Sequence, residues 1–142
     1  MGRTQMCSEA DGNQPTKHES KPRILVVDDE PEIADTVREA LVQGGFEVDI
    51  AENGRQALHT LRAGHHFDLL ITDMRMPGMD GLELLKQVRK LRRNIPAAIL
   101  TGYATFQDGL QAVEEGILEY IAKPFNIRDL MTVVHRALRD RY

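Results

Sequence analysis

Short runs of consecutive apolar residues recur along the chain and predict the central strands of a sheet. The clearest runs cover residues 24–27, 69–71 and 97–100. Strands that are buried on both faces show this continuous pattern, because neither face carries polar side chains. Segments 46–51 and 118–122 are two further strand candidates.

Between these segments, apolar residues recur every three or four positions, which predicts amphipathic helices. Each stripe is interpreted as the face that packs on the sheet. Gly44 and Gly45 are expected to end the first helix, and Gly116 the fourth. The pair Asn53-Gly54 could form a hairpin turn, but the helical pattern after it favours a helix start. The stripes are Ile33, Val37 and Leu41; Leu84, Leu85, Val88 and Leu91; Phe106, Leu110, Val113 and Ile117; and Leu130, Val133, Val134, Ala137 and Leu138.

The alternation of strands and helices predicts an α/β fold with five strand–helix repeats, (βα)5. Consecutive parallel strands need right-handed crossovers, so the helices cover both faces of a parallel sheet. No self-similar repeat accompanies the alternation, which excludes a solenoid.

The bulk properties agree with one domain and exclude several classes of protein. The polar segment 1–21 is predicted to be a disordered tail, and 22–142 the folded domain. A net charge of -4 argues against direct nucleic-acid binding. No apolar run approaches the roughly 20 residues of a membrane span. The single cysteine, Cys7, cannot form an internal disulfide, which favours a cytoplasmic location.

Polar residues gather where the predicted strands end. Asp28 and Asp29 follow the first run, Asp73 the third, Thr101 the fourth and Lys123 the fifth. The carboxyl-terminal strand edge is where open α/β sheets bind ligands, so these side chains are expected on one rim. Carboxylates without cysteine or histidine favour Mg²⁺. With a lysine and a hydroxyl beside it, an aspartate on the middle strand can accept a phosphoryl group.

Each of these residues also has an ordinary structural interpretation. The acidic trio Asp28, Asp29 and Glu30 precedes Pro31 and could cap a helix. Asp73 could be a turn residue, and Lys123 a solvated surface lysine. The combination of four strand ends with matching chemistry favours the functional interpretation.

The sequence resembles the receiver domain of two-component response regulators. The matching segments are ILVVDDEPEI at 24–33, LLITDMRMPGMDGLELL at 69–85, AILTGYAT at 98–105 and EYIAKPF at 119–125. They extend through nearly all of 22–142. The resemblance implies the doubly wound, flavodoxin-like fold of chemotaxis regulators, with strand order 2-1-3-4-5.

The resemblance also implies a role for each residue at the rim. Asp73 matches the phosphoacceptor, Lys123 the phosphate-binding lysine, and Asp28 and Asp29 the Mg²⁺ ligands. The metal site would be completed by Asp73 and the backbone carbonyl of Arg75. The family commonly has a cis peptide at the position of Lys123-Pro124. The phosphoryl donor would be a histidine kinase or a histidine phosphotransfer protein.

Thr101 and Tyr120 match the switch residues of the family. Thr101 would turn toward the phosphoryl group, and the Tyr120 ring would fill the space it leaves. The output face would then lie on the fourth helix, fifth strand and fifth helix. It would bind a downstream output protein or domain, or a second copy of the chain in a phosphorylation-dependent homodimer. Candidate residues of this face are Phe106, Gln107, Gln111 and Glu119.

Three alternatives remain at this point. A Mg²⁺-dependent phosphohydrolase would need a substrate pocket and a second acid, for which the chain shows no insertion. A docking domain without phosphate chemistry would usually lack a rim residue, and none is missing. The chain could also be the receiver part of a larger regulator, with its output elsewhere.

Overall fold

The computed structural model describes residues 21–91, 95–102 and 119–139. Its strands are β2 (Arg23–Val27), β3 (Glu47–Ala51), β4 (Leu69–Asp73), β5 (Ala97–Thr101) and β6 (Glu119–Ala122). Its helices are α1 (Pro31–Gln43), α2 (Gly54–Arg62), α3 (Gly81–Leu91) and α5 (Ile127–Arg139). The helix expected over 106–117, its cap Gly116 and nearly all of the predicted tail lie outside these residues, as do Phe106, Gln107 and Gln111.

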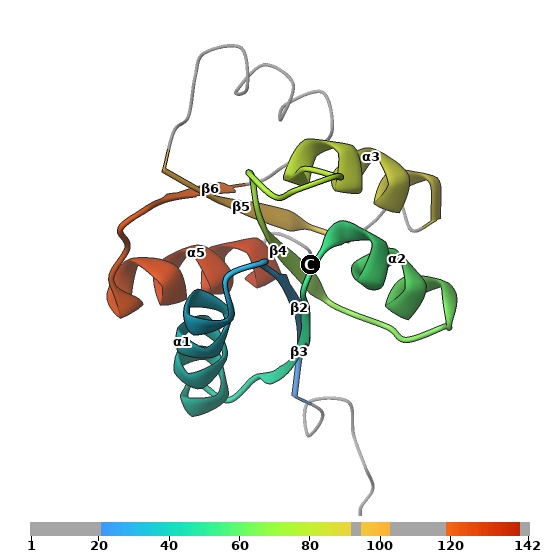
Figure 1. Ribbon diagram of the computed structural model, residues 1–142. Coiled ribbons are helices and arrows are strands. Elements are labelled where there is room, and N and C mark those ends of the chain that lie inside the picture. Colours follow the sequence, from blue (N-terminus) through green and yellow to red (C-terminus); the bar gives the residue numbers. More distant parts are fainter. Residues whose placement is uncertain (1–20, 92–94, 103–118, 140–142) are drawn as a thin grey trace, which may run out of the picture.

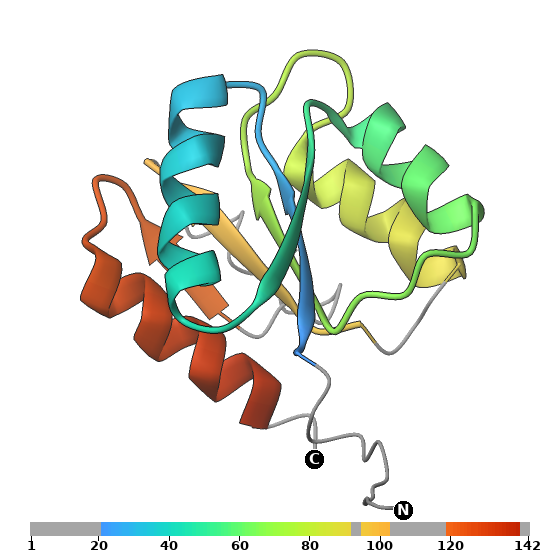
Figure 2. The same ribbon diagram turned by 90° about the horizontal axis from the view of Figure 1, so that it is seen from below.

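The strands form one five-stranded parallel sheet in the order β3-β2-β4-β5-β6. Counted from the first strand of the sheet, this is the predicted order 2-1-3-4-5. Helices α1 and α5 cover one face, and α2 and α3 cover the other (Figures 1 and 2). All carboxyl-terminal strand ends therefore meet at one edge of the sheet.

Two apolar clusters, one on each face, explain why the strand sequences are continuously hydrophobic. Along β2, Ile24 and Val26 pack toward α1 and α5, whereas Leu25 and Val27 pack toward α2 and α3. A third, smaller cluster joins Met74, Leu82 and Ile99, with Tyr120 packed against it. Because successive side chains of a strand point to opposite faces, both sets must be apolar.

The ends of α1 and α2 follow from local sequence. Pro31 occupies the first turn of α1, where its missing N–H removes no helical hydrogen bond. Gly45 ends this helix with φ 96°, and the N–H of Phe46 donates to the carbonyl of Leu41 at 3.0 Å. Phe46 thus belongs to the helix cap, and β3 begins one residue later than predicted. The Asn53 side chain accepts a hydrogen bond from the Gln56 N–H, so Asn53-Gly54 starts a helix, as predicted.

Within the described ranges, no helix has the length and apolar character that a membrane span requires.

Candidate phosphoacceptor and metal site

The structure brings the predicted polar residues together at the carboxyl-terminal edge of the sheet. Asp73 is the last residue of β4 and Thr101 the last of β5, and both are buried. Asp28 follows β2 directly and is also buried, while the neighbouring Asp29 is exposed. Lys123 follows β6, and its backbone N–H donates to the Thr101 carbonyl at 2.8 Å, which ties these two strand ends together.

Three carboxylates form a cluster that could hold a metal ion. One oxygen each from Asp28, Asp29 and Asp73 lie within 4.8 Å of one another. Asp28 Oδ1 accepts a hydrogen bond from the Glu30 N–H at 2.9 Å, whereas buried Oδ2 has no hydrogen-bond partner. A buried carboxylate oxygen without a donor is costly, and a cation would satisfy it. The donor set of hard oxygens fits Mg²⁺.

Lys123 supplies positive charge to this cluster. Its Nζ lies 3.1 Å from Asp73 Oδ1 and donates a hydrogen bond to it. The same Nζ lies 3.7 Å from Glu30 Oε1 and 3.8 Å from Asp28 Oδ2. The Lys123 side chain is only 19% exposed, unlike a solvated surface lysine. The Lys123-Pro124 peptide is cis, as predicted.

The surroundings of Asp28 favour the protonated form of its carboxyl group. Burial raises the pKa of Asp28 from 3.8 to about 6. The Glu30 N–H hydrogen bond acts against this rise, the negative charge of Asp73 adds to it, and Lys123 lowers the pKa again. Burial is the dominant cause, so an arriving cation would compete with a proton at this carboxylate.

Thr101 and Tyr120 lie on the same face of the sheet. Thr101 pairs in register with Ala122, and Ile99 with Tyr120. Since paired residues of parallel strands share a face and side chains alternate, Thr101 and Tyr120 point to one side. Tyr120 is half-buried and packs against the Met74–Leu82–Ile99 cluster. Arg75, by contrast, is exposed in the loop that follows Asp73.

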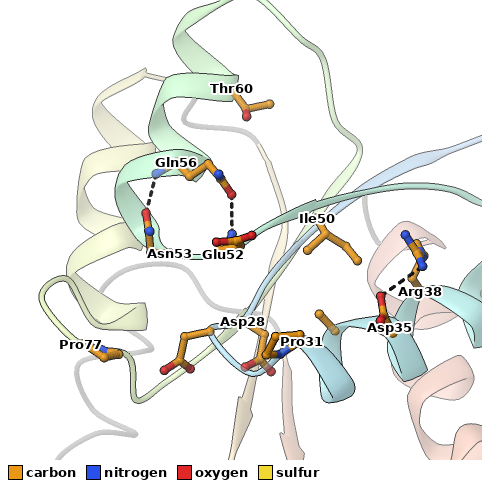
Figure 3. A pocket seen from close by; sticks show the side chains of 12 residues that line it. Asp28, Pro31, Asp35, Arg38, Ile50, Glu52, Asn53, Gln56, Thr60 and Pro77 are labelled. Atoms are coloured by element: carbon orange, nitrogen blue, oxygen red, sulfur yellow. Dashed lines mark hydrogen bonds and ion pairs between the residues drawn. The ribbon is translucent and has the colours of Figure 1, made fainter.

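A groove of about 800 Å³ leads from Asp28 and Asp29 along the start of α1 and the start of α2. Figure 3 shows Pro31 and Asp35 of α1 on one side, with Asn53 and Gln56 opposite. The acidic cluster is therefore accessible from solvent on the Asp29 side.

Glu30, which the sequence offered only as part of a capping trio, lies beside Lys123. The N-cap position of α1 is Glu30, yet its side chain makes no cap hydrogen bond. In the sequence, only the position of Glu30 next to Asp28 and Asp29 pointed to its contact with Lys123. The contact itself depends on the turn after β6, which brings Lys123 close to Glu30.

The five-stranded parallel sheet and the polar residues at its carboxyl-terminal edge can be compared with known proteins. Residues 24–135 match the response regulator receiver domain, so the chain belongs to this family. Its biological setting is two-component signal transduction.

Several curated proteins are similar to this chain over most of its length. The regulatory protein AtoC of Escherichia coli is 40% identical over 117 residues, which are 82% of this chain and 25% of AtoC. The DNA-binding transcriptional regulator NtrC of Bradyrhizobium is 35% identical over 82% of the chain and 24% of its own length. The chain thus spans about a quarter of the curated relatives it matches.

Solved structures of isolated receiver domains match over nearly their whole length. The CheY-like receiver domain protein of Methanospirillum hungatei has a TM-score of 0.82 and 34% identity, over 86% of this chain and 97% of that one. Chemotaxis protein CheY4 of Vibrio cholerae has a TM-score of 0.80 and 31% identity, over 84% and 100%.

Proposed function

We propose that this receiver domain is a switch in which Asp73 accepts a phosphoryl group from a phosphohistidine donor. The observation that carries the proposal is the buried Asp73 carboxylate, with Lys123 Nζ at 3.1 Å and two further carboxylates beside it. The donor would be a histidine kinase or a histidine phosphotransfer protein. No external substrate is turned over; the domain itself is the acceptor.

The chemistry is an in-line transfer between nitrogen and oxygen. An Asp73 carboxylate oxygen forms a bond to phosphorus while the phosphorus–nitrogen bond of the donor breaks, and its electron pair stays on the imidazole. Lys123 lies close enough to Asp73 for its ammonium group to bind a phosphoryl oxygen once the phosphoryl group is on Asp73. Asp28, Asp29, Asp73 and the Arg75 carbonyl would hold Mg²⁺, which neutralises phosphoryl charge when bound.

Intact-mass measurement with a small phosphoryl donor tests this assignment. The parent incubated with acetyl phosphate and Mg²⁺ should gain the mass of one phosphoryl group, and Asp73→Asn should gain none. Asp49→Asn, on the edge strand β3, is the matched control and should label like the parent. Labelling of Asp73→Asn at the parental rate would reject Asp73 as acceptor.

The output step is proposed to run through Thr101 and Tyr120. Their shared face and the packing of Tyr120 on Met74, Leu82 and Ile99 support a coupled movement. An acceptor oxygen of the phosphoryl group would draw the Thr101 hydroxyl, and the Tyr120 ring would follow. The face around β6 and α5 would then bind an output protein or domain, or a second copy of the chain.

A comparison of Thr101→Ala with the parent tests the coupling. At equal labelling, NMR signals of the Tyr120 ring should shift in the parent and stay in place in the variant. Equal shifts in both proteins would refute the coupling and leave Asp73 as acceptor intact. Molecular mass in solution, before and after labelling, tests the homodimer in the same samples.

A further inference from the structure

Two residues approach the backbone carbonyl of Asp73 at the point where β4 leaves the sheet. The Thr72 hydroxyl donates a hydrogen bond to the Asp73 carbonyl at 3.0 Å, and Thr72 is fully buried. Gly81, the first residue of α3, lies against the same carbonyl group. A Cβ atom at Gly81 would stand 2.5 Å from the Asp73 carbonyl oxygen, 3.1 Å from the Met74 Cα and 3.3 Å from the Asp73 carbonyl carbon.

Neither element can easily withdraw from this contact. Strand β4 is central and pairs with β2 and β5, and the Met74 N–H donates to the Leu100 carbonyl at 2.9 Å. Helix α3 is anchored by Leu84 and Leu85, which are buried in the core on its face of the sheet. The Gly81 N–H also donates to the Met74 carbonyl at 2.9 Å, which closes the loop between β4 and α3.

We propose that Gly81 and Thr72 are positioning residues of the phosphoacceptor, which fix the Asp73 backbone and thereby aim its carboxylate. This inference rests on the proposed function of Asp73. A methyl group at Gly81 would push against backbone atoms, so the peptide after Asp73 must rotate or α3 must move. Either response displaces the Asp73 carboxylate from the Asp28–Asp29 pair and from Lys123, the partners that both cation binding and transfer require.

Gly54 provides a matched control. It is also buried and also the first residue of a helix, α2. A Cβ at Gly54 would meet the Met79 side chain, with Sδ at 2.7 Å, Cγ at 3.1 Å and Cβ at 3.2 Å. The flexible thioether can turn away, and the Cβ needs to shift by only a few tenths of an ångström. Gly54→Ala therefore introduces the same methyl group at an equivalent helix position without pressing on Asp73.

The test measures Mg²⁺ affinity by calorimetry without donor, and the labelling rate by intact mass at saturating Mg²⁺. Gly81→Ala should weaken Mg²⁺ binding. It should also slow labelling by about 10- to 100-fold, as expected for an ångström-scale displacement of the carboxylate. Gly54→Ala should match the parent in both. A mere loss of stability would lower the folded fraction and leave the Mg²⁺ affinity of the folded protein unchanged.

Thr72→Val decides the question if Gly81→Ala does not fold, because valine keeps the shape of threonine and removes only the hydroxyl. We expect a loss in both measurements of about 2- to 10-fold, the range of one ordinary hydrogen bond. Parental Mg²⁺ affinity and labelling in a folded Gly81→Ala protein, or in Thr72→Val, would overturn the positioning role. If the parent itself does not label at Asp73, the proposed function fails, while the Mg²⁺ titrations still test whether Gly81 and Thr72 position the carboxylate.

Discussion

At the amino-terminal edge of the sheet, Arg23 has several polar partners, whereas at the carboxyl-terminal edge the carboxylates of Asp28, Glu30 and Asp73 share Lys123. The Arg23 guanidinium donates to Asp49 Oδ2 at 2.8 Å and lies over the Phe67 ring, 5.0 Å from its centre. Its backbone N–H donates to Asp68 Oδ2 at 2.9 Å. At the other edge, Asp28 Oδ2 is buried without a hydrogen bond.

The difference shows that aspartates can serve opposite purposes on one sheet. At the amino-terminal edge Asp49 and Asp68 each accept a hydrogen bond from Arg23, so their charge contributes to stability. At the carboxyl-terminal edge the carboxylates are placed closer together than their own repulsion favours, so charge lowers stability until a cation binds. The following predictions test this contrast, beginning with the largest expected effect.

Asp28→Asn should stabilise the protein in the absence of Mg²⁺. The pKa of Asp28 is raised from 3.8 to about 6, which corresponds to roughly 3 kcal/mol of unfavourable ionisation at neutral pH. The amide keeps the oxygen that accepts from the Glu30 N–H and removes the buried charge. Urea unfolding with a chelator measures the gain. An equal or lower free energy of unfolding in Asp28→Asn would show that Asp28 carries no such penalty.

The same group should give a characteristic pH dependence. Between the unfolded pKa of 3.8 and the folded pKa of about 6, the folded protein binds the additional proton. The Asp28 contribution to the free energy of unfolding must therefore fall as pH rises through this window. The stability difference between Asp28→Asn and the parent should be near zero at the lower limit and reach its full value above the upper one. A difference that is constant with pH would contradict the raised pKa.

Mg²⁺ should stabilise the parent by binding the folded state. At ten times its dissociation constant, the cation should raise the free energy of unfolding by about 1.4 kcal/mol. At the same concentration the gain should be smaller in Asp28→Asn, which lacks one anionic ligand, and unchanged in a variant of the other edge such as Arg23→Met. Thermal unfolding with and without Mg²⁺ measures all three proteins; equal gains in parent and Asp28→Asn would place the cation elsewhere.

Arg23→Met should have the smallest effect, and with the opposite sign to Asp28→Asn. Methionine retains an apolar stem over Phe67 but loses the ion pair with Asp49 and the cation–π contact. Because the Arg23 side chain is 34% exposed, solvent screens these interactions, and we expect a loss of about 1 kcal/mol. Unfolding in urea measures the loss, and labelling at Asp73 should stay at the parental rate. A higher free energy of unfolding in Arg23→Met than in the parent would contradict the proposed difference between the two edges of the sheet.

Much of the fold could be predicted because burial on both faces leaves a simple signal in the strands. Ile24 to Val27 divide between the two cores, and the predicted stripes of α1, α3 and α5 face them. The exception is Leu91 at the end of α3, which was predicted to be part of the core face but is 42% exposed because the helix ends there. The predicted start at Phe46 was wrong by one residue, since the Gly45 cap draws Phe46 into the end of α1. Rim residues were also predictable, because parallel strands end at one edge.

What surrounds Asp73 could not be predicted in the same way. The contact of Glu30 with Lys123 joins residues 93 positions apart through the turn after β6. The roles of Thr72 and Gly81 depend on backbone distances that no periodicity encodes. Thr72 looks like a β-branched strand residue, and Asp80-Gly81 looks like an ordinary helix start, which it also is: the Asp80 side chain accepts from the Glu83 N–H.

The Asp28 oxygen that lacks a hydrogen bond has a consequence on the evolutionary timescale. A lineage that stopped using the cation would gain stability from the first neutral substitution at position 28, without any compensating change. Selection for function is then the only force that retains the acid. Among descendants that keep the fold as a docking module, substitutions should therefore appear at Asp28 earlier than at the apolar residues of β2 beside it.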